Sequence, residues 1–232
     1  MNERKWYIAA LIGDLFLAAS SLTGVLTNVF RIYFMINLGR MTSAPFFSTF
    51  TGLSNTIIGV LALLSLIFRL AYKKRELPSW LFLTKLIATA LIAITFLITA
   101  LVLAPNVGED WWRLYINGSL FNHLLTPLIA VACFMVFEKR SESPYRFCLL
   151  SLLPMGAYIV FYFARAFSNV GPDGAIDPYY DIYGMAQFGI PAAIGLAFAF
   201  LALSLALTSL LYLQNHRKKN PKEEPPEQDA LA

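Results

Sequence analysis

The chain alternates between long apolar runs and short segments that carry most of its charge. The apolar runs cover residues 7–37, 46–70, 81–104, 115–137, 146–167 and 186–213. A helix that crosses the hydrocarbon core of a bilayer needs about 20 largely apolar residues and satisfies its own backbone hydrogen bonds. Strands of a membrane barrel would alternate apolar and polar residues, and these runs show no such alternation. The pattern therefore predicts an all-α, polytopic integral membrane protein with six transmembrane helices.

The composition supports this class. Of 232 residues, 58% are hydrophobic and 14% are charged, against about 25% charged in an ordinary soluble domain. No basic face with interleaved aromatic residues is present, so nucleic acid is not expected as a partner. By its length the chain forms one transmembrane domain over residues 1–214. Residues 215–232 are rich in Lys, Glu and Pro, which predicts a disordered cytoplasmic tail.

The loops between the runs differ in charge. Basic residues precede the first run and follow the second (from Arg69 to Arg75), the fourth and the sixth, whereas acidic residues gather in the alternate loops. Basic loops stay in the cytoplasm. The distribution therefore predicts cytoplasmic N and C termini and a multi-pass protein of the cell (inner) membrane.

Polar residues inside the predicted spans gather at one depth. Thr51 and His123 lie about five to eight residues past the outer ends of their helices, or about 8–12 Å deep. Other polar residues near this depth are Arg31, Asn55, Asn122, Tyr162 and Arg165. Because polar side chains in a span face the bundle interior or a watery cavity, we expect one site in the outer leaflet. The alternative is a structural role, through hydroxyls bonded to backbone carbonyls and arginines that reach the interface.

A second polar pair lies near the cytoplasmic side. Asp14 in the first run and Lys85 in the third are each about one to two turns from that face. An unpaired charge inside the membrane is costly, so we predict a structural ion pair, with a proton relay as the alternative.

The chemistry open to the outer layer is narrow. A zinc site needs several His, Cys or carboxylate ligands, and this layer has one His and no embedded acid. We therefore predict no metal and no cofactor. A hydroxyl with an imidazole is the minimum for nucleophilic acyl transfer, in which the base takes a proton while the oxygen attacks a carbonyl. Asn55, Asn122, Tyr162 or Arg165 would then stabilise the developing oxyanion.

Three short motifs resemble a known family. Residues 46–55 (FFSTFTGLSN) are similar to the Phe-Thr-x-x-Ser-Asn start of a span in bacterial six-helix proteins. Residues 122–128 (NHLLTPL) are similar to their His-x-x-x-Pro-Leu, and residues 162–165 with 177–180 to their Arg followed by a Pro-Tyr-rich turn. These proteins resemble the androgen-induced-protein family of membrane hydrolases, which includes the androgen-dependent TFPI-regulating protein.

The resemblance implies an intramembrane hydrolase of fatty acid esters of hydroxy fatty acids. It places the nucleophile at Thr51, or at Thr49 if the register shifts by two, and the base at His123. Animal members carry Asn-His-x-x-His with the second His catalytic, and Thr126 stands at that position here. Either His123 serves as the base in a shifted frame, or the catalytic His and the activity are missing.

We therefore expect a threonine/histidine hydrolase that takes a lipid-like ester laterally from the bilayer, with Arg165 or Arg31 holding a fatty-acid carboxylate. The alternative is a non-enzymatic membrane protein, such as a lipid or small-solute carrier or an assembly partner. Prolines in three of the runs permit the kinked helices of a carrier. The oligomeric state stays open.

Overall fold

The computed structural model describes residues 3–37, 46–74, 76–138, 143–177 and 179–217. Within these ranges the chain is helical and has no strand, apart from an isolated antiparallel bridge between Val170 and Ile176. The all-α prediction is confirmed.

The described helices follow the order of the apolar runs. The first two runs form α1 (Glu3–Asn37), a 3-10 turn η1 (Phe46–Ser48) and α2 (Phe50–Tyr72). The third forms α3 (Ser79–Ile98), a π-helix η2 (Thr99–Leu103) and α4 (Ala104–Val107), and a 3-10 helix η3 (Gly108–Tyr115) follows. The fourth forms α5 (Asn117–Leu120), a second π-helix η4 (Phe121–Leu125) and α6 (Thr126–Phe137). The last two form η5 (Tyr145–Ser151), α7 (Leu152–Phe167), η6 (Ala186–Phe188) and α8 (Gly189–Arg217).

Among the described residues, six helical stretches are long and apolar enough to cross a membrane. They coincide with the six predicted runs, as expected of a multi-pass membrane protein. Some ends differ from the prediction, because α1 begins at Glu3 and α8 continues to Arg217. The start of the predicted tail is therefore helical, and the rest of it, residues 218–232, lies outside the described residues.

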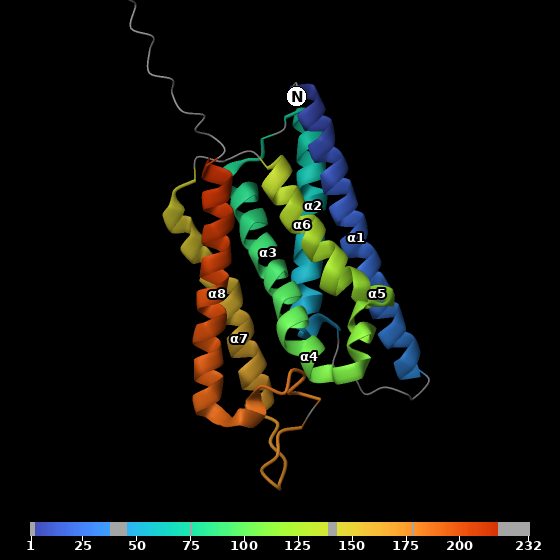
Figure 1. Cartoon of the computed structure of the whole chain (residues 1–232), viewed down its shortest axis with the longest axis vertical. Coiled ribbons are helices and arrows are strands. Elements are labelled where there is room, and N and C mark those ends of the chain that lie inside the picture. Colours follow the sequence, from blue (N-terminus) through green and yellow to red (C-terminus); the bar gives the residue numbers. More distant parts are fainter. Residues whose placement is uncertain (1–2, 38–45, 75, 139–142, 178, 218–232) are drawn as a thin grey trace, which may run out of the picture.

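The helices form a bundle in which both ends of the described chain lie together. Figure 1 shows the start of α1 and the end of α8 at one end, and η3 with the segment Ser168–Met185 at the other, which we call the distal end. Helices α1, α2, α3 and α6 pack against one another, and α8 packs on α3 and α7. Helix α3 is the most buried span and α8 the least.

Four charged side chains meet in the bundle near the end that holds the start of α1. Asp14 (α1), Arg69 (α2), Lys85 (α3) and Glu138, which follows α6, form this charge cluster, and each side chain is at most 2% exposed. Arg69 Nε lies 2.9 Å from Asp14 Oδ2 and its Nη2 lies 2.7 Å from Glu138 Oε2. Lys85 Nζ lies 2.6 Å from Glu138 Oε1 and also bonds Asp14 Oδ1. The predicted Asp14–Lys85 ion pair is confirmed, and it belongs to a larger, charge-balanced network.

Glycines allow α1 to approach its neighbours closely. A Cβ added at Gly59 of α2 would lie 2.2 Å from Ser21 Oγ on α1, and one at Gly24 of α1 would lie 2.2 Å from Asn122 Oδ1. Small residues at helix contacts are a common device in membranes, where dispersion contacts between helices drive association. These glycines therefore set how closely α1 approaches α2 and η4.

Candidate functional site

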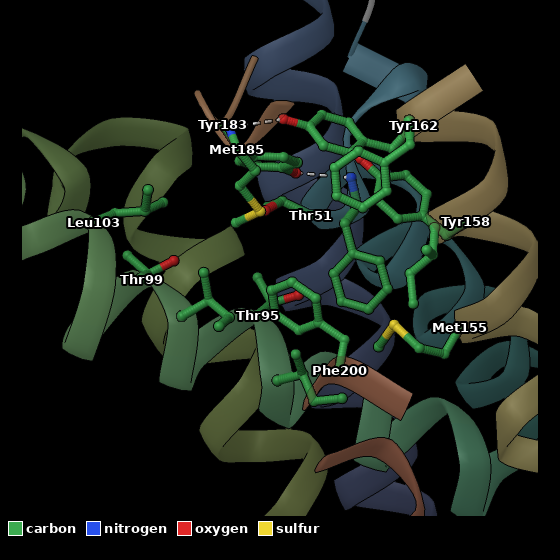
Figure 2. Close-up of a pocket in the computed structure, with 15 residues that line it drawn as sticks. Thr51, Thr95, Thr99, Leu103, Met155, Tyr158, Tyr162, Tyr183, Met185 and Phe200 are labelled. Carbon is green, nitrogen blue, oxygen red and sulfur yellow. Dashed lines mark hydrogen bonds between the residues drawn. The ribbon is translucent and has the colours of Figure 1, made fainter. Parts of the chain in front are cut away.

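A cavity lies in the distal half of the bundle (Figure 2). It is bounded by the first turn of α2, by α3 with η2, by α7 and α8, and by the segment before α8. Its volume is about 560 Å³ including the open mouth. The apolar lining comes from Phe50, Ile94, Ile98, Leu103, Met155, Ile159, Phe163, Met185 and Phe200. Hydroxyls come from Thr51, Thr95, Thr99, Tyr158, Tyr162 and Tyr183.

Thr49 fixes the start of α2 and thereby the position of Thr51. The Thr49 hydroxyl accepts a hydrogen bond from Gly52 N (2.9 Å) and donates one to Phe46 O (2.7 Å), as expected of an N-cap threonine. Of the two threonines proposed as nucleophile, Thr49 therefore caps the helix, whereas Thr51 lines the cavity.

Tyr183 closes the polar end of the cavity. Its hydroxyl accepts a hydrogen bond from Phe50 N at 2.9 Å, and Tyr183 lines the cavity together with Tyr158 and Thr51. Burial raises the pKa of the Tyr183 phenol, so that the group stays protonated at neutral pH and keeps a proton to donate. Figure 2 shows Tyr183, Tyr162 and Thr51 at one end of the cavity, with Met155 and Phe200 towards the other. The cavity thus has a polar end and an apolar end.

Asp181 holds the segment that carries Tyr183. Its carboxylate accepts hydrogen bonds from the Tyr162 hydroxyl and from the backbone N–H groups of Met185 (3.0 Å), Ala186 (3.1 Å) and Gln187 (3.1 Å). Asp181 is 7% exposed. Charge-assisted bonds of this kind are about twice as strong as neutral ones. One buried carboxylate therefore ties α7 to the start of the last helix.

We expect the Asp181→Asn substitution to loosen this segment. Asparagine keeps the size of the side chain but loses the charge. We therefore expect the free energy of opening at the backbone N–H groups of Met185–Gln187 to fall by about 1 kcal/mol, which makes their hydrogen exchange about fivefold faster. Asp173→Asn is the matched control, because Asp173 lies in the same segment and the hydrogen bond that it accepts from Ala175 N (3.1 Å) is exposed. Equal exchange at residues 185–187 in the two variants would contradict this role of Asp181.

The predicted base lies elsewhere. His123 is in η4, and its Nδ1 lies 2.9 Å from Leu114 O, so the imidazole joins η4 to η3. Asn55 Nδ2 donates to Thr51 O (2.9 Å) and to Asn122 O (3.1 Å), which joins α2 to η4. His123, Asn55 and Asn122 are not among the residues that line the cavity.

The two predicted arginines also lie outside the cavity lining. The Arg165 guanidinium lies over the rings of Tyr179 (5.4 Å) and Tyr180 (5.1 Å), and its Nη2 donates to Tyr179 O at 3.4 Å. Arg31 is exposed on α1. Of the seven predicted site residues, the structure brings Thr51 and Tyr162 together in one cavity and leaves the other five outside it.

Sequence reasoning missed Tyr183, Tyr158 and the hydroxyls of α3 as lining residues. Tyr158 lies four residues before Tyr162, and nothing in this spacing points to the segment before α8. The hydroxyls of Thr95 on α3 and Ser54 on α2 are 2.9 Å apart. The presence of a threonine in so apolar a helix was the one signal in the sequence that α3 contributes a hydroxyl there.

The arrangement suits binding better than catalysis. Among the described residues that line the cavity there is no His, Asp, Glu, Lys or Arg, so Thr51 has no side chain of basic character beside it there. A nucleophilic hydroxyl needs an adjacent base. Nor does any group of three or more His, Cys, Asp or Glu among the described residues form a place for a metal ion.

Comparison of the chain with known protein families, with curated proteins and with solved structures finds no match. The resemblance of residues 46–55 and 122–128 to the androgen-induced-protein family therefore stays a prediction, and the function is argued from the geometry.

Proposed function

We propose that this protein binds a lipid-like molecule in its distal cavity. The observation that carries the proposal is a largely apolar cavity between helices long enough to span a membrane, with Thr51, Tyr162 and Tyr183 at one end and the hydroxyls of Thr95 and Thr99 along its wall. Ligand sites in proteins are typically apolar clefts with a few placed polar groups. The predicted orientation would put this cavity in the outer leaflet, where a ligand enters from the bilayer.

Selectivity in such a site rests on its polar end. A lipid chain that moves from the bilayer into an apolar cavity gains little from the hydrophobic effect, because lipid tails are as apolar as the cavity wall. Packing against Met155 and Phe200 would select the shape of the chain. Hydrogen bonds with Thr51 and Tyr183 would select the head group, because a polar group in the hydrocarbon core is costly unless it finds a partner.

A lipid ester hydrolase is the second candidate. It is favoured by one observation, that Thr51 lines a cavity suited to a lipid ester. Catalysis by Thr51 and His123 would require the imidazole to leave Leu114 and reach the cavity. We rank hydrolysis below binding because of this requirement.

Binding is tested by blocking the cavity. A long-chain alcohol that carries a mid-chain diazirine and an alkyne tag is photolysed with the full chain in nanodiscs, and the labelled residues are mapped by mass spectrometry. Ile98 lines the cavity, so Ile98→Trp is expected to lower labelling of cavity residues by about tenfold. Leu101→Trp is the matched control, because Leu101 lies three residues further and is 70% exposed. Equal labelling of the two variants, or labels confined to lipid-facing residues, would exclude the proposed site.

The two candidates are separated by a fluorophosphonate probe and a fluorogenic long-chain ester. A hydrolase would become labelled at Thr51 and would lose turnover in both Thr51→Ala and His123→Ala. For a binding protein we expect no labelling at Thr51 and no turnover above the level of empty nanodiscs.

A further inference from the structure

The charges around the cavity lead to a more specific statement about the ligand, which rests on the proposed function. We infer that the cavity takes an uncharged lipid with a small hydrogen-bonding head, such as an alcohol, ester or ketone, and excludes lipid anions. The head would lie beside Thr51 and Tyr183, and the chain would run towards Met155 and Phe200.

An anionic head would find no cation in the cavity. The lining, as far as the chain is described, contains no full charge. Arg165, which follows the lining residue Phe163 by two positions, is engaged with two tyrosine rings and with Tyr179 O, outside the lining. Arg31 is exposed on α1. A carboxylate enclosed in apolar surroundings without a partner is strongly disfavoured, so a fatty-acid anion does not fit this site.

Asp181 adds to the exclusion of anions. Its carboxylate bonds the Tyr162 hydroxyl, and Tyr162 lines the cavity. A negative head at the polar end would therefore face a second negative charge behind one layer of side chains. The same charge would attract a cationic head, but the carboxylate is not among the lining groups and already accepts bonds from three backbone N–H groups, so no counter-ion would contact the cation and repay its desolvation.

The hydroxyls at the polar end match a neutral head. The Thr51 and Tyr183 hydroxyls can each donate and accept, and the Tyr183 oxygen already accepts from Phe50 N. An alcohol or carbonyl oxygen exchanges one or two hydrogen bonds with such a pair and leaves no charge to compensate. The few polar groups at this end limit the number of polar atoms that a bound head can satisfy.

Three photoprobes with the same diazirine-bearing chain test the inference. Their heads are an alcohol, a sulfonate and a trimethylammonium, whose charges do not depend on pH in the neutral range. With the whole protein in nanodiscs, we expect the alcohol probe to label cavity residues at least about tenfold more than either charged probe. Equal labelling by the sulfonate or the trimethylammonium probe would overturn the inference and leave the proposed binding function intact. If none of the three labels the cavity, the proposed function itself fails.

A cation placed in the lining should admit the anion. Leu103 lines the cavity at the end of η2 and is partly exposed, so a charged side chain there keeps some contact with the surroundings. We expect labelling by the sulfonate to be about tenfold higher in Leu103→Lys than in the size-matched Leu103→Gln. An equal response of the two variants would show that charge is not what excludes the anion and would overturn the inference. If Leu103→Lys does not fold, the three-probe comparison on the unmodified chain decides alone.

Discussion

Replacing Lys85 by methionine is expected to lower the free energy of unfolding by about 3–5 kcal/mol, the usual cost of removing one member of a buried ion pair. The Lys85 ammonium bonds both carboxylates of the charge cluster, and its side chain is fully buried. Without it, Asp14 and Glu138 share Arg69 alone, and the cluster carries an uncompensated negative charge in the bundle. Thermal and denaturant unfolding in detergent micelles measure the loss.

Two further variants separate charge balance from loss of contacts. The double variant Asp14→Asn with Lys85→Met removes one charge of each sign and leaves the Arg69–Glu138 pair, so we expect it to be more stable than Lys85→Met alone. Lys74→Met removes an exposed lysine near the end of α2 and should change stability by at most about 0.5 kcal/mol. If the double variant is the least stable of the three, the cluster stabilises through its individual bonds and not through its charge balance.

The second large effect is expected at the contact between α1 and α2. Gly59→Ala places a Cβ 2.2 Å from Ser21 Oγ and 2.8 Å from Ser21 Cβ. Ser21 cannot turn away without losing its 2.6 Å hydrogen bond to Asn55 O. The helices must therefore move apart, and we expect a loss of about 3 kcal/mol, at the upper end of the cost of overpacking.

The control for Gly59→Ala is another glycine inside a spanning helix. A Cβ at Gly195 of α8 meets nothing within 4 Å, so Gly195→Ala should be neutral or stabilising by at most about 1 kcal/mol through its higher helix propensity. Combining Gly59→Ala with Ser21→Ala removes the nearest clash and should recover part of the loss. Equal unfolding temperatures for Gly59→Ala and Gly195→Ala would contradict the close contact.

The number and class of helices follow from the sequence because both depend on the length and apolarity of each run. The charge cluster was predicted only in part. Asp14 and Lys85 interrupt long apolar runs and so required partners. Arg69 stands next to the basic residues that open the following loop and was counted with them, although its side chain is fully buried. A charged side chain near the end of a span can lie at the membrane interface or inside the bundle. The packing of the other helices decides between these two locations.

The site was harder to predict because the fourth run is not a regular α-helix around His123. Ser119, His123 and Thr126 share one face of a regular α-helix, but the π-helix Phe121–Leu125 changes the turn between them. Thr126 consequently bonds Ser20 of α1 (2.8 Å), while His123 turns to Leu114. The contribution of Tyr183 depends on the path of an irregular segment between two helices, which no periodicity encodes.

The order of the charges along the chain bears on how the protein is assembled during synthesis. Each of the first four spans brings one member of the charge cluster, in the order Asp14, Arg69, Lys85 and Glu138. The net charge of the cluster is therefore −1 after the first span is made, 0 after the second, +1 after the third and 0 after the fourth. The first two spans can leave the insertion machinery as a neutral hairpin. The third brings an ammonium that has no free counter-ion until Glu138 emerges from the ribosome. We therefore expect release of the third span from the insertion machinery to depend on translation of the fourth.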